Sequence, residues 1–98
     1  MEDCGEIKQQ ADRAADQYYP VLTDWAASGA KDEGLRQEAR RRAGVFRRSL
    51  DWLIDCYQRV RGSFRAQRAM ENAVELKQLV ENDIENLDRY GQLNSEQG

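Results

Sequence analysis

The spacing of apolar residues between positions 35 and 60 constrains the fold of this chain more than any other feature. Apolar side chains recur there every three or four residues, at Leu35, Ala39, Ala43, Phe46, Leu50, Leu53, Tyr57 and Val60. That interval is the period of an α-helix with one buried face. Val45, Trp52 and Cys56 extend the face on one side and Ile54 on the other, so that it spans roughly 200° at about 100° per residue. A face this wide needs more than one neighbour, and we predict a central helix over 34–61 that contacts both other segments or another chain.

A second stripe with the same period follows it. Its members are Ala69, Met70, Ala73, Leu76, Val80, Ile84 and Leu87, and they predict a helix over 64–90. Gly62 weakens a helix and Ser63 can cap a new one, which favours an antiparallel hairpin over one continuous helix. Gly91 is a natural C-terminal stop, and we expect a disordered tail over 93–98.

The N-terminal segment has helical spacing as well. Its stripe is Ile7, Ala11, Ala14, Tyr18, Leu22 and Trp25. Pro20 lies inside the stripe, but the apolar phase is the same on both sides, which favours a kinked helix. The alternative is a break at Tyr19, with Pro20 starting a second short helix. Residues 28–34 read as a loop. The sequence therefore predicts an all-α protein, an antiparallel helical hairpin plus an N-terminal kinked helix, as one three-helix bundle domain over 1–92.

The size of the chain makes self-association attractive. Ninety-eight residues form one domain at most, and many of its apolar residues are alanines, which bury little area. Burial of one large apolar side chain contributes roughly 1.5–3 kcal/mol, whereas ordering costs about 1.5 kcal/mol per residue. A lone bundle is then marginally stable, and we expect an oligomer, most simply a homodimer, or a protein partner.

Charge is distributed unevenly along the chain, although the net charge is only −3. Residues 1–33 carry 3 basic and 8 acidic groups, residues 34–68 carry 10 and 3, and residues 69–98 carry 2 and 7. One interpretation is internal complementarity, with the basic helix pairing with acidic neighbours. The other is a binding surface for phosphates or for an acidic protein.

Two charged faces are candidate partner sites. The basic face comprises Arg36, Arg40, Arg41, Arg47, Arg48, Arg59 and Arg65. The acidic face comprises Glu71, Glu75, Glu85 and Asp88. An acidic row can imitate a nucleic-acid backbone, but a solvated helix face has the same pattern. A third candidate, the apolar flank of Val45, Trp52 and Cys56, could contact an oligomer mate or partner.

Two charges fall on apolar faces. Arg42 lies on the apolar arc of the central helix and Asp83 on that of the last helix. In a hairpin bent near residue 62, position 42 lies roughly opposite position 82, so we expect these two residues to pair inside the bundle. Alternatively, Arg42 extends its charged head to the edge.

Several classes of protein are not expected. The chain has no histidine, no glycine-rich phosphate loop and no nucleophile motif, which argues against an enzyme, a metal site or a cofactor site. Cys4 and Cys56 are far apart, without CxxC spacing, and are expected to be free thiols. No apolar run could span a membrane, and the acidic N-terminus is unlike a signal peptide, which predicts a cytoplasmic location.

These features together favour a non-enzymatic module for protein–protein interaction. The expected form is a small regulator, adaptor or inhibitor of a larger protein or nucleoprotein machine, of a kind that phages and mobile elements encode. The first alternative is nucleic-acid binding through the Arg-rich face, and the second is mimicry of nucleic acid by the acidic helix.

Overall fold

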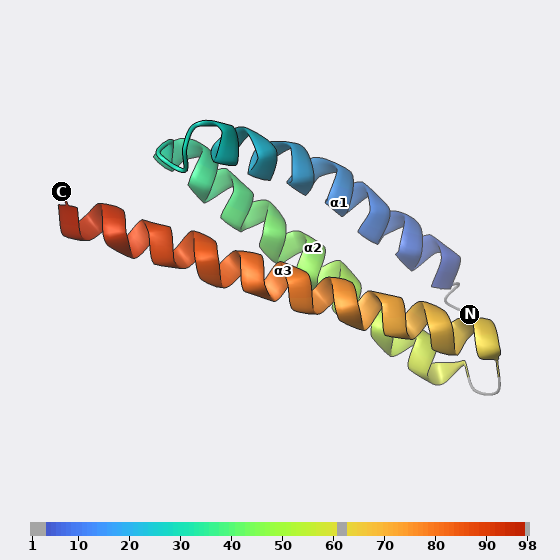
Figure 1. Ribbon diagram of the computed structural model, residues 1–98. Coiled ribbons are helices and arrows are strands. Elements are labelled where there is room, and N and C mark those ends of the chain that lie inside the picture. The colour runs from blue at the N-terminus through green and yellow to red at the C-terminus, as the bar shows by residue number, and fades with distance from the viewer. Residues whose placement is uncertain (1–3, 61–62, 98) are drawn as a thin grey trace.

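The computed structural model describes residues 4–60 and 63–97, and within them the chain forms three helices and no strand (Figure 1). These are α1 (Cys4–Ala27), α2 (Glu33–Arg59) and α3 (Phe64–Gln97). The molecule is elongated, with extents of 53 × 19 × 19 Å. Both α1 and α3 pack along α2, but no described Cα of α1 lies within 8 Å of a Cα of α3. The all-α three-helix bundle is confirmed, and so is the central position of the second helix.

Helix α1 is continuous through Pro20. Tyr18 and Trp25 are both buried, so apolar contacts hold the helix on each side of the proline despite the hydrogen bond it removes. The alternative of two separate helices is therefore wrong, whereas the kink stays a prediction.

A tight turn joins α1 to α2. The amide of Ala30 donates to Trp25 O and that of Gly29 to Ala26 O, at 3.2 and 3.0 Å. This is the hydrogen-bond pattern of a Schellman motif, and Gly29 has the positive φ of 75° that the motif requires. The side chain of Asp32 then accepts from Leu35 N and caps α2. The loop predicted over 28–34 is present but shorter, because α2 already begins at Glu33.

The core follows the predicted stripes. One buried cluster includes Tyr18, Phe46, Leu50 and Val80, with at least one member from each helix. A smaller cluster joins Trp25, Ala39 and Leu87 near the α1–α2 turn. The α2 stripe faces both other helices at once, which is why its apolar face is so wide.

Ion pairs line one side of the α2–α3 seam. Arg40 Nε lies 2.9 Å from Asp88 Oδ1, and Lys77 Nζ lies 2.7 Å from Asp51 Oδ1. Arg47 Nε lies 3.7 Å from Glu81 Oε1. These pairs run antiparallel, as the hairpin predicts. In two of them an arginine of the basic helix meets a carboxylate of the acidic helix, whereas the Lys77–Asp51 pair has the opposite polarity. Because they are solvent-exposed, each contributes only about 0–1 kcal/mol.

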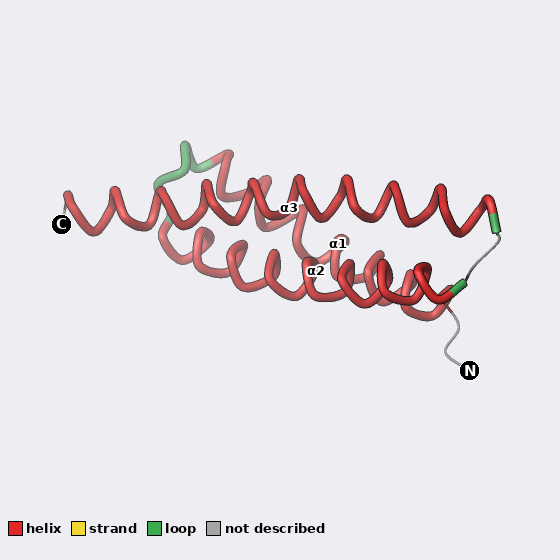
Figure 2. The backbone as a smooth tube through the Cα atoms, turned by 90° about the horizontal axis from the view of Figure 1, so that it is seen from below, coloured by secondary structure: helices red, strands yellow, loops and turns green. Residues whose placement is uncertain are grey.

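The predicted end of the last helix is wrong. Helix α3 continues past Gly91 to Gln97, so most of the predicted disordered tail is helical, and it extends beyond the α1–α2 turn (Figure 2). Gly91 serves a close approach instead of a stop, since a Cβ at this position would lie 2.7 Å from Arg36 Cζ. At the other end, Ser63 Oγ accepts from Ala66 N as a cap, and Gly62 lies outside the described residues.

The prediction of free thiols is also wrong. Cys4 and Cys56 form a disulfide with a Cα–Cα distance of 5.8 Å. Because α1 and α2 are antiparallel, the first turn of α1 lies beside the last turn of α2. The two cysteines are therefore neighbours in space although 52 positions separate them in the sequence.

The predicted Arg42–Asp83 pair is not formed. Arg42 Nε donates to Glu38 Oε1 at 2.6 Å, one turn away on the same helix, and Nη1 lies 3.5 Å from Gln17 Oε1 of α1. Asp83 accepts instead from the hydroxyl of Tyr18 at 2.7 Å. Arg42 does not reach Asp83 because its side chain lies on the side of α2 that faces α1.

Candidate functional site

The strongest candidate site is an open groove between α1 and α3, called here the interhelical groove. It arises because the backbones of the two outer helices stay apart, with no described Cα pair within 8 Å. It encloses about 190 Å³. Its lining residues are Lys8, Ala11, Asp12, Ala15 and Tyr19 of α1, Phe46, Leu50, Leu53 and Tyr57 of α2, and Ala69, Asn72, Ala73 and Leu76 of α3.

Helix α2 forms the floor of the groove. Phe46, Leu50 and Leu53 are all buried, and Tyr57 is partly buried at one end. They belong to the same apolar stripe that predicted the helix, so the floor is part of the hydrophobic core. The groove is therefore apolar at its base and rests on the central helix of the fold.

The α1 wall combines small residues with one exposed ring. Ala11 and Ala15 keep the wall low, and the Tyr19 ring stands beside them with 41% exposure. Its centroid lies 5.9 Å from that of Phe46 in an edge contact. Lys8 Nζ and Asp12 Oδ2 form an ion pair of 3.1 Å at the rim, so the charges that line the groove neutralise each other.

The α3 wall has the same composition. Ala69 and Ala73 are small, Asn72 offers an amide, and Leu76 is a large apolar side chain with 39% exposure. Half-exposed leucine above a buried apolar floor is a surface that gains free energy on being covered, by about 25 cal/mol per Å² of apolar area.

A hydrogen bond between the outer helices closes one end of the groove. Tyr18, which is fully buried, donates its hydroxyl to Asp83 across the gap between α1 and α3. Burial and the neighbouring carboxylate raise the pKa of the Tyr18 phenol far above its usual value, so it remains a donor at any physiological pH. Further along, the Trp25 and Tyr90 rings meet edge to face with centroids 5.1 Å apart.

The disulfide lies near the other end of the groove and joins α1 to α2. Cys4 precedes the rim residue Lys8 by one helical turn, and Cys56 is the neighbour of Tyr57 on the floor. The bridge thus ties the α1 wall to the α2 floor where α1 begins. The Tyr18–Asp83 hydrogen bond links the two walls directly, whereas the bridge fixes the α1 wall to the floor.

The two walls carry net negative charge. Helix α1 has four acidic and two basic residues, and α3 has seven acidic and four basic. Asp16 of α1 does not line the groove but lies in an adjoining hollow, which shares Ala15 and Tyr19 with it. The positive charge of α2 is directed elsewhere, since no arginine lines the groove.

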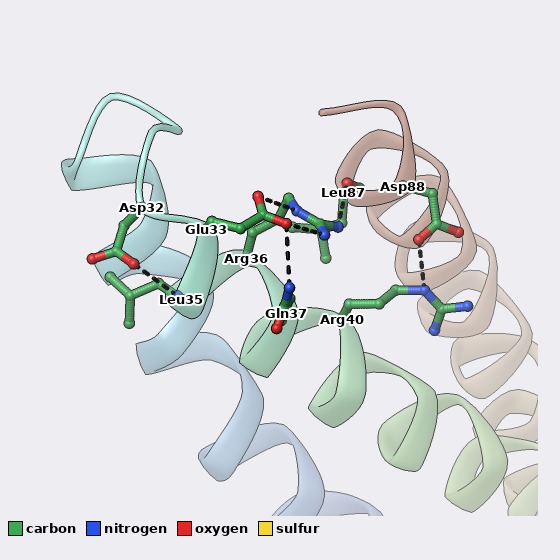
Figure 3. Close-up of polar contacts among 8 residues, drawn as sticks. All are labelled: Asp32, Glu33, Leu35, Arg36, Gln37, Arg40, Leu87 and Asp88. Atoms are coloured by element: carbon green, nitrogen blue, oxygen red, sulfur yellow. Dashed lines mark hydrogen bonds and ion pairs between the residues drawn. The ribbon is translucent and has the colours of Figure 1, made fainter. Parts of the chain in front are cut away.

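Most of the predicted basic face is engaged within the protein. Arg36 donates to Glu33 and to Leu87 O, next to the Arg40–Asp88 pair (Figure 3). Arg47 pairs with Glu81, Arg41 with Glu38, and Arg59 with Asp55. Only Arg48 and Arg65 of the seven have no ion-pair partner within residues 4–60 and 63–97. The structure does not bring these arginines together as a free phosphate site.

The other predicted residues are placed as follows. Glu71, Glu75 and Glu85 are exposed on α3, whereas Asp88 is held by Arg40. On α2, Val45 and Trp52 are 48% and 54% exposed, but Cys56 is buried in the disulfide. The apolar flank therefore consists of Val45 and Trp52 alone.

Sequence reasoning missed the groove itself. Two signals pointed to it: the alanine pairs at 11 and 15 and at 69 and 73, and the position of Tyr19 beside its stripe. Small residues on two helices are typical of close packing, and here they face each other across a gap instead.

Neither a metal site nor a membrane span is found in the described part of the chain. No group of three metal-binding side chains lies together there, and no helix is long and apolar enough to cross a bilayer. Comparisons with family models, curated proteins and solved structures find no match.

Proposed function

We propose that this protein is a non-enzymatic interaction module whose interhelical groove binds an amphipathic helix of a partner protein, with basic residues beside the apolar face of that helix. A small regulator, adaptor or inhibitor of a larger protein is the role that such a module serves. The observation that carries the proposal is the groove, since three helices present an apolar floor and two low walls to solvent.

A helix is the occupant that best fits the groove. The two walls run along the same α2 floor, and a fourth helix laid between them would complete a four-helix arrangement. Helix-in-groove recognition uses large apolar side chains as anchors, and the volume of about 190 Å³ suits one such anchor.

Charge selects the kind of helix. The helices that form the walls are net negative, and Asp16 of α1 lies in the hollow that adjoins the groove, whereas Asp12 at the rim is paired with Lys8. Basic groups flanking the apolar anchors of the partner would meet opposite charge, whereas acidic groups would be repelled. Nucleic acid, the runner-up, is disfavoured for the same reason and because the arginines of α2 are engaged.

The predicted location is weakened by the disulfide. Such bonds form and persist in oxidising compartments and are rare in the cytosol. We therefore propose that the groove binds its partner in an environment where the Cys4–Cys56 disulfide stays intact.

Synthetic helical peptides test the proposal. Two labelled peptides with identical apolar residues and either lysine or glutamate flanks are titrated with the protein, and fluorescence anisotropy is measured. We expect tighter binding of the basic peptide and weaker binding at high salt. Leu76→Glu, which blocks the groove, should abolish binding. Val74→Glu is the matched control, because Val74 is similarly exposed on α3 but does not line the groove.

The proposal is wrong if neither peptide binds, or if both variants lower the affinity equally. If both peptides bind equally, the groove is an apolar binding site, but the proposal that it prefers a basic helix is wrong.

A further inference from the structure

The outer side of α2 carries an exposed stripe that matches the groove in chemistry. This stripe, called here the α2 ridge, consists of Arg41, Val45, Arg48 and Trp52, spaced four, three and four residues apart. That spacing aligns them along one side of a helix. Two half-exposed apolar side chains thus alternate with two cations, which is the amphipathic basic helix that the groove would select.

We propose that the α2 ridge of one copy of this chain docks in the interhelical groove of a second copy, with the Trp52 indole over the apolar floor. This inference rests on the proposed function and names one partner for the same groove.

The sizes agree. An engineered cavity of about 150 Å³ binds benzene, and the groove encloses about 190 Å³, so it has room for one aromatic anchor. Trp52 is 54% exposed, and tryptophan is among the side chains that contribute most when an interface buries them. Tyr19, which lines the groove and is 41% exposed, offers the indole an aromatic neighbour.

The charges agree as well. Arg48 has no ion-pair partner among the described residues, and Arg41 pairs only with Glu38 on the surface. Placed along the groove, these cations would face the net negative α1 wall, where Asp16 lies in the adjoining hollow and Asp12 is paired with Lys8. The outward side of α3, by contrast, presents Glu71, Glu75 and Glu85, which the negative walls would repel.

The contact is head-to-tail. Trp52 and the floor residues lie on different sides of α2, roughly 130° apart at about 100° per residue, and α1 lies between them. One copy therefore uses its ridge with one neighbour and its groove with another. Such a heterologous contact leaves a free ridge and a free groove at the ends and extends into longer chains.

Two complementary variants test this geometry. Trp52→Glu removes the ridge and keeps the groove, whereas Leu76→Glu blocks the groove and keeps the ridge. Light scattering measures the molar mass from micromolar to millimolar concentration, with circular dichroism as the check that each variant is helical. We expect the mass of the wild type to rise continuously with concentration and each variant alone to be monomeric. The 1:1 mixture should show a two-fold mass and stop there. Val74→Glu should associate like the wild type.

Three results would overturn the inference: a wild type that is monomeric throughout, a Trp52→Glu variant that still associates alone, or a mixture that stays monomeric. These outcomes are separable from failure of the proposed function. A monomeric wild type that binds the basic peptide through Leu76 retains the groove function and loses only the second copy as its partner.

Discussion

Replacing Gly91 with alanine should destabilise the protein, although alanine is the better helix former. Gly91 lies inside α3, where a Cβ would meet Arg36 Cζ at 2.7 Å and Nη1 at 2.8 Å. The guanidinium cannot swing aside freely. Its Nη1 donates to Leu87 O at 3.0 Å, and its Nε donates to Glu33 Oε2 at 2.9 Å, as Figure 3 shows.

The two contributions to the change have opposite signs. Alanine in place of glycine stabilises a helix interior by about 1 kcal/mol. Glu33 and Arg36 are on the same helix and can shift together, so the bond that is lost is the one to Leu87 O. A hydrogen bond from a charged donor contributes about 1.5–3 kcal/mol. The net loss in the wild type is therefore about 0.5–2 kcal/mol.

A double-mutant cycle isolates the contact. With Arg36→Ala as the background, the guanidinium is absent, and Gly91→Ala should stabilise by the full helix propensity, raising Tm by about 4–8 °C for a chain of this size. In the wild-type background the same change should lower Tm. Gly44→Ala is the control, because the nearest atom to its Cβ is 3.6 Å away, and it should stabilise in both backgrounds.

The reasoning is refuted if Gly91→Ala raises Tm equally with and without Arg36. The coupling would then be zero, and Gly91 would have no role in admitting the guanidinium. Thermal unfolding followed by circular dichroism gives all four values of the cycle.

Three further predictions follow from the contacts of Tyr18 and the disulfide. Tyr18→Phe leaves the Asp83 carboxylate without its donor and should cost about 1–3 kcal/mol; urea unfolding measures this, and adding Asp83→Asn should recover part of the loss, since the unpaired charge is then gone. The raised pKa of Tyr18 means that its hydroxyl ionises in the unfolded chain first, so its contribution is complete below a pH of about 10 and is lost above it; Tm should fall more steeply with alkaline pH in the wild type than in Tyr18→Phe. Reduction of Cys4–Cys56 should lower the free energy of unfolding by about 4 kcal/mol in the chain-entropy model, and an unchanged urea midpoint in dithiothreitol would contradict this.

The helices were predictable because their signal is local. Apolar spacing along each segment sets the buried face, and every fully buried large side chain, such as Tyr18, Leu50 and Val80, lies on a predicted stripe. The central position of α2 followed from the width of its face. The blocks of charge in the sequence predicted ion pairs between α2 and α3, and such pairs line one side of the contact between these helices.

The errors concern contacts between distant residues. Spacing could place Asp83 on a buried arc but could not say which donor would face it, because Tyr18 and Arg42 were both within reach of a three-helix bundle. A glycine at position 91 is typical of the end of a helix. Only the close approach of Arg36 shows why a glycine lies inside α3 instead. The two cysteines become neighbours through the direction of α1, which their separation in sequence conceals.

The disulfide changes the argument for association. A chain with this many alanines buries little apolar area, and for this reason its sequence favoured an oligomer or a protein partner. A cross-link worth about 4 kcal/mol is a large share of the 5–15 kcal/mol by which native domains are stable, so the bridge reduces the stability that a mate would have to supply. We therefore predict that folding does not require the exposed Leu76 and Trp52 to be covered, and that their occupation responds to concentration, salt and competing helices.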